Sequence, residues 1–408
     1  MAIDKGTGNG LATDVSARDG QSEQGSAIFT NNSWLGSVYI GSRIPGLDMP
    51  QRSANKLAPF LLIGGVVVLS IAGFAWAGGW IGPSRIGGSA LAGAIEKNSG
   101  TFPGYRRAHA KGLCFEGTFQ ANGSGASLSS AGVMAAGQYP VIGRFSTGGS
   151  NPFATDGRNV FHAMALQISG AHGQIWRMAL DHTPIFPVAT PKAFVALQRA
   201  TTPLTSTGKP DPKVLGSYLA EHPETKAFQS YLDNEPLPDS FAGGTYHSIN
   251  AFHFIDSAGR VSSVRWAMVP ETPMVALDKS KLDSLPTDYL FNEILTRLAK
   301  GPVRWHMIVT IAQPGDRTDD ATVQWPQNRP TVDVGILTIT RAEPEETGPC
   351  RDITFDPTLL PAGVELSDDP LLPARSAAYS ASFRMRALEG PEPSAIGKKL
   401  AAEQMGGK

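Results

Sequence analysis

The chain contains few cysteines and few charges for its length. Only Cys114 and Cys350 occur among 408 residues, and neither lies in a C-x-x-C or C-x-x-C-H pattern. This excludes a disulfide framework, a cysteine zinc site and covalent attachment of a prosthetic group. The two cysteines either pair in an oxidising compartment or stay free. The 35 basic residues balance 36 acidic ones, so nucleic acid is a poor candidate partner.

Charge is absent from one long run near the N-terminus. Residues 1–56 are rich in Gly, Ser, Asn and Asp without apolar periodicity, which predicts a disordered tail. The run 57–81 has no charged residue, and its stretch PFLLIGGVVVLSIAGFAWAG matches the roughly 20 residues that cross a bilayer core. We therefore predict a transmembrane or signal-anchor segment over 57–81, followed by a linker over 82–100.

The basic residues flanking this segment predict its orientation. Arg43, Arg52 and Lys56 precede it closely, whereas Arg85 alone follows it within the same distance. This bias favours a cytoplasmic N-terminus, with a single pass through the inner membrane and the large domain facing the periplasm or the exterior.

An alternative start leads to a secreted protein. If Met49 begins the chain, the apolar run becomes a signal peptide with a cleavage site near Ala77. Both interpretations export the domain.

Residues 101–390 have the pattern of a single domain dominated by strands. Segments that mix β-branched, aromatic and alternating polar residues are 112–119, 141–146, 162–168, 174–180, 263–269, 305–312 and 332–341. Helical patterns cover 191–200, 211–221, 286–299 and the residues from 371 onward. We predict an α+β protein with an antiparallel β-barrel, inserted and closing helices, and a flexible C-terminal tail over 391–408.

Three motifs carry candidate chemistry. In the last predicted helix, Arg375, Tyr379 and Arg386 follow one stripe at helical spacing. A guanidinium beside a phenol favours the phenolate, which is the state that a ferric iron needs in an axial ligand. The second motif is R-R-A-H-A-K-G around His109, and the third is R-F-S-T-G-G at 144–149. Each motif alone is also compatible with a purely structural role.

Together and in this order, the motifs resemble those of the haem catalases. T-P-I-F at 183–186 followed by Phe194 is similar to the family's N-N-T-P-x-F segment and the phenylalanine against its haem. V-D-V-G-I-L-T-I-T-R at 332–341 and L-P-A-G-V-E at 360–365 resemble the strand and loop that precede its proximal helix. The resemblance spans roughly 102–386 and implies a non-covalent haem b (iron protoporphyrin IX).

The resemblance implies a role for each matching residue. His109 is the distal acid/base with Ser146 as its orienting hydroxyl, and Tyr379 is the iron ligand, with Arg375 as its phenolate partner. The other residues placed against the haem are Phe186, Phe194 and, as propionate clamps, Arg106, Arg144 and Arg386.

The sequence departs from the family at two polar positions. Asp181, followed by His182, stands in place of the distal asparagine, and a shift of one residue would put His182 there. An ionised carboxylate accepts but does not donate a hydrogen bond, so we predict weak or no dismutation. Asn250 stands where catalases usually carry a histidine, and Asp369 matches the acidic residue behind the proximal arginine.

The remaining chain is short, since 22 residues follow Arg386. This length is similar to that of the catalase-related peroxidase branch. The resemblance implies a monomeric or homodimeric enzyme that reduces hydrogen peroxide or organic hydroperoxides with a small organic donor, using His109, Ser146 and Asp181 as catalytic residues. Two alternatives stay open: a haem-binding protein without turnover, and a hydroperoxide isomerase or dehydratase.

Overall fold

The computed structural model describes residues 58–77, 86–158 and 161–406, and it divides into two units, Met1–Gly73 and Phe74–Lys408. The helix α1 (Ala58–Ala77) is uncharged, and large apolar side chains such as Phe60, Leu61 and Leu69 are exposed on it. Over the described residues, the helices all lack the combination of length and apolar character that crossing a membrane requires. This finding does not support the predicted membrane span over 57–81. The predicted disordered tail, 1–56, lies outside the described residues.

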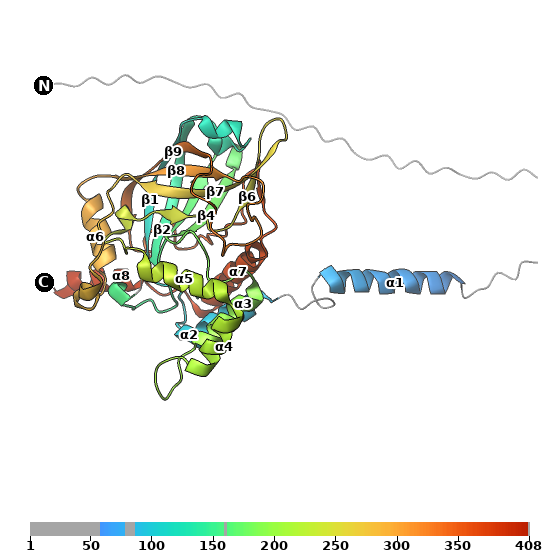
Figure 1. Cartoon of the computed structure of the whole chain (residues 1–408), viewed down its shortest axis with the longest axis horizontal. Helices are drawn as coiled ribbons and strands as arrows, with labels where there is room; N and C mark the ends of the chain where they lie inside the picture. Colours follow the sequence, from blue (N-terminus) through green and yellow to red (C-terminus); the bar gives the residue numbers. More distant parts are fainter. Residues whose placement is uncertain (1–57, 78–85, 159–160, 407–408) are drawn as a thin grey trace, which may run out of the picture. The chain divides into compact units, whose positions relative to one another are not determined.

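Antiparallel strands of the second unit close into a barrel (Figure 1). Each strand pairs with the next in the order β7-β5-β4-β3-β2-β1-β9-β8, and β8 pairs with β7 to complete the circle. The eight barrel strands are β1 (Gly112–Ala121), β2 (Gly137–Thr147), β3 (His162–Ser169), β4 (Ile175–Asp181), β5 (Tyr246–His247), β7 (Val261–Pro270), β8 (Val303–Ile311) and β9 (Thr331–Glu343). β6 (Phe252–Ile255) and β10 (Val364–Leu366) extend the sheet beyond β7. The predicted α+β class with an antiparallel barrel is confirmed, and all seven predicted strands overlap barrel strands.

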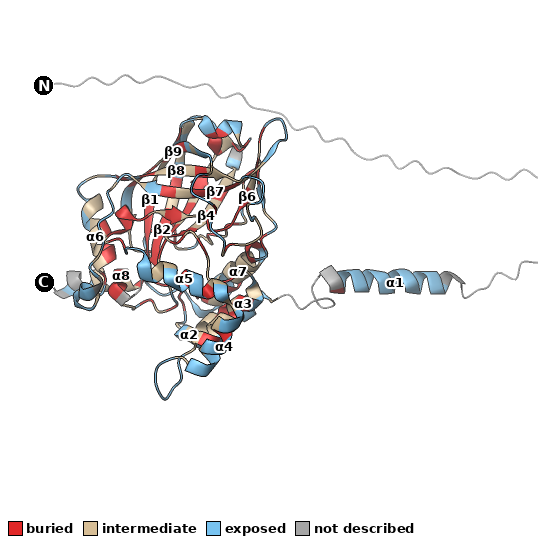
Figure 2. Cartoon of the chain, viewed as in Figure 1, coloured by how far each residue is buried: buried red, intermediate tan, exposed pale blue. Residues whose placement is uncertain are grey.

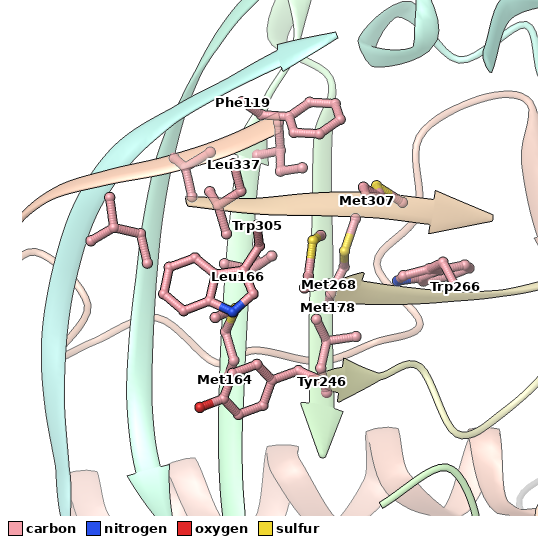
Figure 3. Close-up of a cluster of buried hydrophobic side chains, with 14 of the residues drawn as sticks. Phe119, Met164, Leu166, Met178, Tyr246, Trp266, Met268, Trp305, Met307 and Leu337 are labelled. Carbon is pink, nitrogen blue, oxygen red and sulfur yellow. The ribbon is translucent and has the colours of Figure 1, made fainter. Parts of the chain in front are cut away.

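Side-chain alternation on β2, β3 and β4 separates the core from the site. Met164 and Leu166 of β3 and Met178 of β4 are buried, and Figure 3 shows them in a cluster with Trp305 and Tyr246. Figure 2 shows buried residues concentrated on the strands of the barrel. Residues between these core positions point to the other face of the sheet, because successive side chains in a strand alternate. That outer face of β2, β3 and β4 carries the polar residues of the site.

Seven helices accompany the barrel in the described part of the second unit. They are α2 (Gly88–Ser99), α3 (Pro191–Thr201), α4 (Pro212–Glu221), α5 (Pro223–Asn234), α6 (Tyr289–Leu298), α7 (Leu371–Glu389) and α8 (Ala395–Gly406). Figure 1 shows α2 and α3 close together, and buried Leu91 of α2 and Val195 of α3 belong to one apolar cluster, which Ala378 of α7 also contacts. The four predicted helices correspond to α3, α4, α6 and α7.

Two helices lie where we predicted irregular chain. α2 falls within the predicted linker 82–100, and α8 falls within the predicted flexible tail 391–408. Their few apolar side chains find partners far along the chain: Leu91 packs in the cluster of α3, and Ile396 of α8 is buried in the core of the barrel. Tertiary packing therefore orders segments whose own apolar pattern is weak.

Candidate active site

A cavity of about 250 Å³ lies against the outer face of β2, β3 and β4 and is bounded by α2, α3 and α7. It brings together all ten of the predicted site residues. These are Arg106, His109, Arg144, Ser146, Asp181, Phe186, Phe194, Arg375, Tyr379 and Arg386. The stripe predicted for the last helix is confirmed, since Arg375, Tyr379 and Arg386 of α7 line the same cavity.

His109 occupies a constrained position at the cavity wall. Its backbone φ is +53°, a left-handed value that is uncommon for a residue with a side chain and costs on the order of 1–3 kcal/mol. The ring Nδ1 lies 3.4 Å from the Ser146 hydroxyl, the contact that the sequence motifs predicted. Loss of solvation, together with the charges of Arg144, Arg375 and Arg106, lowers the pKa of His109 to about 3. The imidazole is therefore neutral near neutral pH and able to accept a proton.

Asp181 ends β4 and turns its carboxyl toward the cavity. Burial raises its pKa to about 7, against the opposing charge of Arg375. From the sequence alone we expected an ionised carboxylate at position 181 that can only accept hydrogen bonds. The structure corrects this, because a substantial fraction of Asp181 is protonated near neutral pH and can donate.

The neighbouring His182 faces elsewhere. Its Nδ1 accepts a hydrogen bond from the backbone N–H of His162 at 3.2 Å, and it lines a separate small cavity with residues of α5 such as Gln229. Of the two alignments left open by the sequence, the structure thus places Asp181, and not His182, at the cavity.

A hydrogen-bonded chain supports the helix that carries Tyr379. Arg375 Nη1 donates to Asn250 Oδ1 at 2.5 Å, and Asn250 Nδ2 donates to Asp369 Oδ2 at 2.7 Å. Asp369 Oδ1 also accepts from the N–H of Leu371 at the start of α7. From the sequence we expected Arg375 to contact the Tyr379 phenol. Its second guanidinium nitrogen, Nη2, instead donates to the carbonyl oxygen of Ala179 at 3.1 Å. Asn250 therefore links the proximal arginine to its acidic partner.

Three arginines gather at one end of the cavity around a carboxylate that the sequence analysis missed. Glu345 accepts from Arg144 Nε and Nη2, both at 2.9 Å, and lies 3.5 Å from Arg106 Nε. Burial opposes its ionisation, but Arg144, Arg106 and Arg386 lower the pKa of Glu345 to about 2. Gly112 makes room for this contact, since a Cβ there would lie 2.2 Å from the Arg144 guanidinium carbon. No sequence motif surrounds Glu345, so only its place beside the arginines in the folded structure identifies it as part of the site.

Much of the remaining cavity wall is apolar. Phe186 and Phe194 stack with ring centroids 6.2 Å apart and planes inclined by 17°. Small side chains, Ala163 and Ala165 of β3 and Ala378 of α7, also line the cavity. A flat macrocycle with two carboxylates fits this set, because a phenol and an imidazole are available as axial groups, guanidiniums lie at one end and apolar walls lie between.

The chain is similar to known catalases and catalase-related peroxidases. The family model for catalase matches residues 102–396. The chain is 36% identical to a catalase-related peroxidase of Synechococcus elongatus over 293 residues, covering 72% of this chain and 86% of the relative. It is 33% identical to a catalase-related peroxidase of Mycolicibacterium paratuberculosis over 294 residues, covering 72% of this chain and 92% of the relative.

Solved catalases share the fold. A fungal catalase superimposes with a TM-score of 0.62 at 18% identity, covering 69% of this chain and 59% of that catalase. A bacterial catalase superimposes with a TM-score of 0.60 at 22% identity, covering 76% of this chain and 64% of that catalase. The chain thus spans about three fifths of the length of these two structures.

The fold, the site and the family match together define a haem-dependent enzyme, and the chain belongs to the catalase family. The two relatives described above, at 36% and 33% identity, carry the name catalase-related peroxidase, which places the chain in that branch as a haem peroxidase.

Proposed function

We propose that this enzyme binds haem b and reduces hydrogen peroxide or organic hydroperoxides with electrons from a small organic donor. The observation that carries the proposal is the placement of His109 and Tyr379 in one cavity whose end holds Arg106, Arg144 and Arg386. When bound, haem supplies the electrons that break the oxygen–oxygen bond, and the donor restores them. Tyr379 would ligate the iron as its phenolate, and the three arginines would hold the two propionates.

The distal residues would move the proton. His109, neutral at working pH, accepts a proton from the peroxide oxygen nearer the iron and returns it to the departing oxygen, which leaves as water or an alcohol. Ser146 orients the ring through Nδ1. Protonated Asp181 donates a hydrogen bond to the peroxide, as an amide would, and loses this ability as the pH rises through about 7.

In dismutation, a second peroxide molecule supplies the electrons that the organic donor supplies otherwise. We expect this second step to be slow, so dismutation would stay weak. The names of the two relatives support this part of the proposal, and so does the loss of the Asp181 proton above about pH 7, where an amide would still donate. The test compares oxygen release from hydrogen peroxide with oxidation of a phenolic donor by the haem-loaded protein. Donor oxidation that clearly exceeds oxygen release is expected, and vigorous oxygen release without a donor contradicts it.

The same assay separates the alternative functions. Consumption of a lipid hydroperoxide without any donor would identify an isomerase or dehydratase. Tight haem binding without peroxide consumption would identify a carrier, for which the neutral His109 has no use.

We further propose that the domain is exported to the periplasm or the exterior, either anchored or cleaved near Ala77. The disulfide between Cys114 and Cys350 supports export, because such bonds persist in oxidising compartments. Cell fractionation with thiol counting under non-reducing denaturation tests this. A cytoplasmic protein with two free thiols would contradict it.

A further inference from the structure

The segment that follows β9, residues 344–353, supplies partners to the three arginines at one end of the cavity, Arg106, Arg144 and Arg386. Its side chains contribute Glu345, which meets the Arg144 guanidinium through two parallel bonds of 2.9 Å, and the exposed Asp352, whose Oδ1 lies 3.7 Å from Arg386 Nη2. This fork-to-fork geometry fixes the plane of the guanidinium as well as its distance. With the solvent-exposed Asp352 left out, three guanidiniums and the ionised carboxylate of Glu345 leave a net charge of about +2, which complements a ligand with two carboxylates.

The backbone of the same segment orients the other two arginines. Arg386 Nη2 donates to the carbonyl oxygen of Arg351 at 2.7 Å. Arg106 Nη2 lies 3.2, 3.0 and 3.2 Å from three carbonyl oxygens, those of Cys350, Arg351 and Ile353. One nitrogen can meet three carbonyls only while the backbone keeps this curled shape. The orientation of Arg106 therefore depends on the conformation of residues 350–353.

The disulfide fastens this segment to the barrel wall. Cys114 lies on β1 directly opposite Arg144 of β2 in the strand register, and its sulfur is bonded to Cys350. Both cysteines are fully buried and pack with Phe355, which itself lines the cavity. The bond thus joins the segment that orients the arginines to the strand pair from which Arg144 projects.

We propose that the Cys114–Cys350 disulfide, acting through residues 344–353 and Glu345, is a positioning element that controls how long the enzyme retains its haem. The proposal rests on the proposed function. Formation of the bond removes one proton and one electron from each thiol, and a disulfide oxidant takes up both electrons and leaves as a dithiol. Because both cysteines are buried, the bond acts as a lasting fastening in the folded protein rather than as a rapid switch.

The test compares release of two ligands, hemin and its dimethyl ester, which lacks the carboxylates. Each loaded protein is mixed with excess apo-globin, and transfer is followed by absorbance. The double variant Cys114→Ala/Cys350→Ala is expected to release hemin at least about tenfold faster, the effect of losing one charge-assisted hydrogen bond. Release of the dimethyl ester is expected to change little, because the arginines have no carboxylate to hold.

A core variant controls for general loss of stability. Met307 is fully buried in the barrel core and is not among the residues lining this cavity, so Met307→Ala destabilises the fold without touching the segment. Met307→Ala is expected to leave the ratio of the two release rates unchanged. Equal acceleration of both ligands in the double variant, or no acceleration of either, overturns the proposal.

Glu345→Gln tests the same idea with the disulfide intact, should the double variant not fold. It removes the fork on Arg144 and is expected to speed release of hemin but not of the ester. Glu346→Gln is the matched control, since Glu346 accepts hydrogen bonds from Ser394 instead. Slower hemin release from Glu345→Gln would show that Glu345 merely repels the ligand, and would overturn its role. Failure of the wild-type protein to bind hemin at all would instead refute the proposed function.

Discussion

The two sides of the cavity differ in how firmly their residues are held. On the side of the cavity with His109 and Asp181, the His109 ring lies 3.4 Å from the Ser146 hydroxyl. The neutral imidazole of His109 is favoured, and Asp181 is protonated at acidic to neutral pH. On the supporting side, Arg375 and Asn250 are joined by a bond of 2.5 Å. The side chains that we propose to exchange protons are thus neutral and have few hydrogen bonds, whereas the arginine that we propose to support the iron ligand is charged and held by short hydrogen bonds.

The largest expected effect separates turnover from cofactor binding. His109→Ala is expected to lower kcat/KM for hydrogen peroxide by about 10²- to 10⁴-fold, because general acid–base catalysis is lost. The hemin affinity is expected to stay within a few-fold, since the supporting side is intact. Steady-state kinetics with a phenolic donor and a hemin titration measure both, and Ser146→Ala is the milder companion variant. A kcat/KM within tenfold of the wild-type value would show that His109 is not the general acid–base residue and would contradict the proposed difference between the two sides.

The supporting side is expected to show its importance in stability. Asn250→Ala leaves Arg375 and Asp369 without their shared partner, and Asn250 and Asp369 are buried. We expect a loss of about 2–4 kcal/mol in the free energy of unfolding, measured by urea titration. The control, Asn328→Ala, removes an exposed amide and is expected to change this free energy by less than about 0.5 kcal/mol. Identical unfolding midpoints for both variants would contradict the account.

Asp181→Asn sharpens the comparison through pH. Wild-type activity is expected to fall as pH rises through about 7, where Asp181 loses its proton and with it the ability to donate. An amide donates at every pH, so the variant is expected to lack this step and to exceed wild type by up to about tenfold one unit above the pKa. The measurement is kcat/KM from pH 5 to 9 for the wild type and the variant. Parallel profiles for the two proteins would show that the Asp181 proton has no role in the reaction.

The same substitution has a consequence for stability. The folded state keeps the Asp181 proton up to about pH 7, whereas the unfolded chain releases it near the ordinary value of 3.8. The stabilising effect of the proton is therefore complete below pH 3.8 and is lost as pH rises through about 7. Thermal melts are expected to show that Asp181→Asn gains stability relative to wild type between these limits. A constant difference across them would mean that the carboxyl titrates normally.

The sequence predicted the parts of the site that depend on local spacing. Tyr379 and Arg386 follow helical periodicity, and Arg144 and Ser146 alternate on one strand, so their shared face follows from the chain itself. Glu345 escaped notice because its partner Arg144 lies 201 residues away and no motif marks it.

Other differences arise from burial, which a single sequence does not display. The protonated form of Asp181 depends on its enclosure in the folded chain, and local residues gave no sign of it. Likewise, α8 is ordered by the contact of Ile396 with the barrel core, although its own segment is poor in apolar residues. Long-range packing decides both outcomes.

Tyr379→Phe tests the central claim that haem is held between a phenolate and the imidazole of His109. The full-length protein and the variant are each titrated with hemin, and the absorption spectrum and peroxide reactivity are recorded. We expect the wild-type spectrum of a tyrosinate-ligated ferric haem to disappear in the variant together with peroxide turnover. An unchanged spectrum and unchanged turnover after loss of the phenol oxygen would contradict the account.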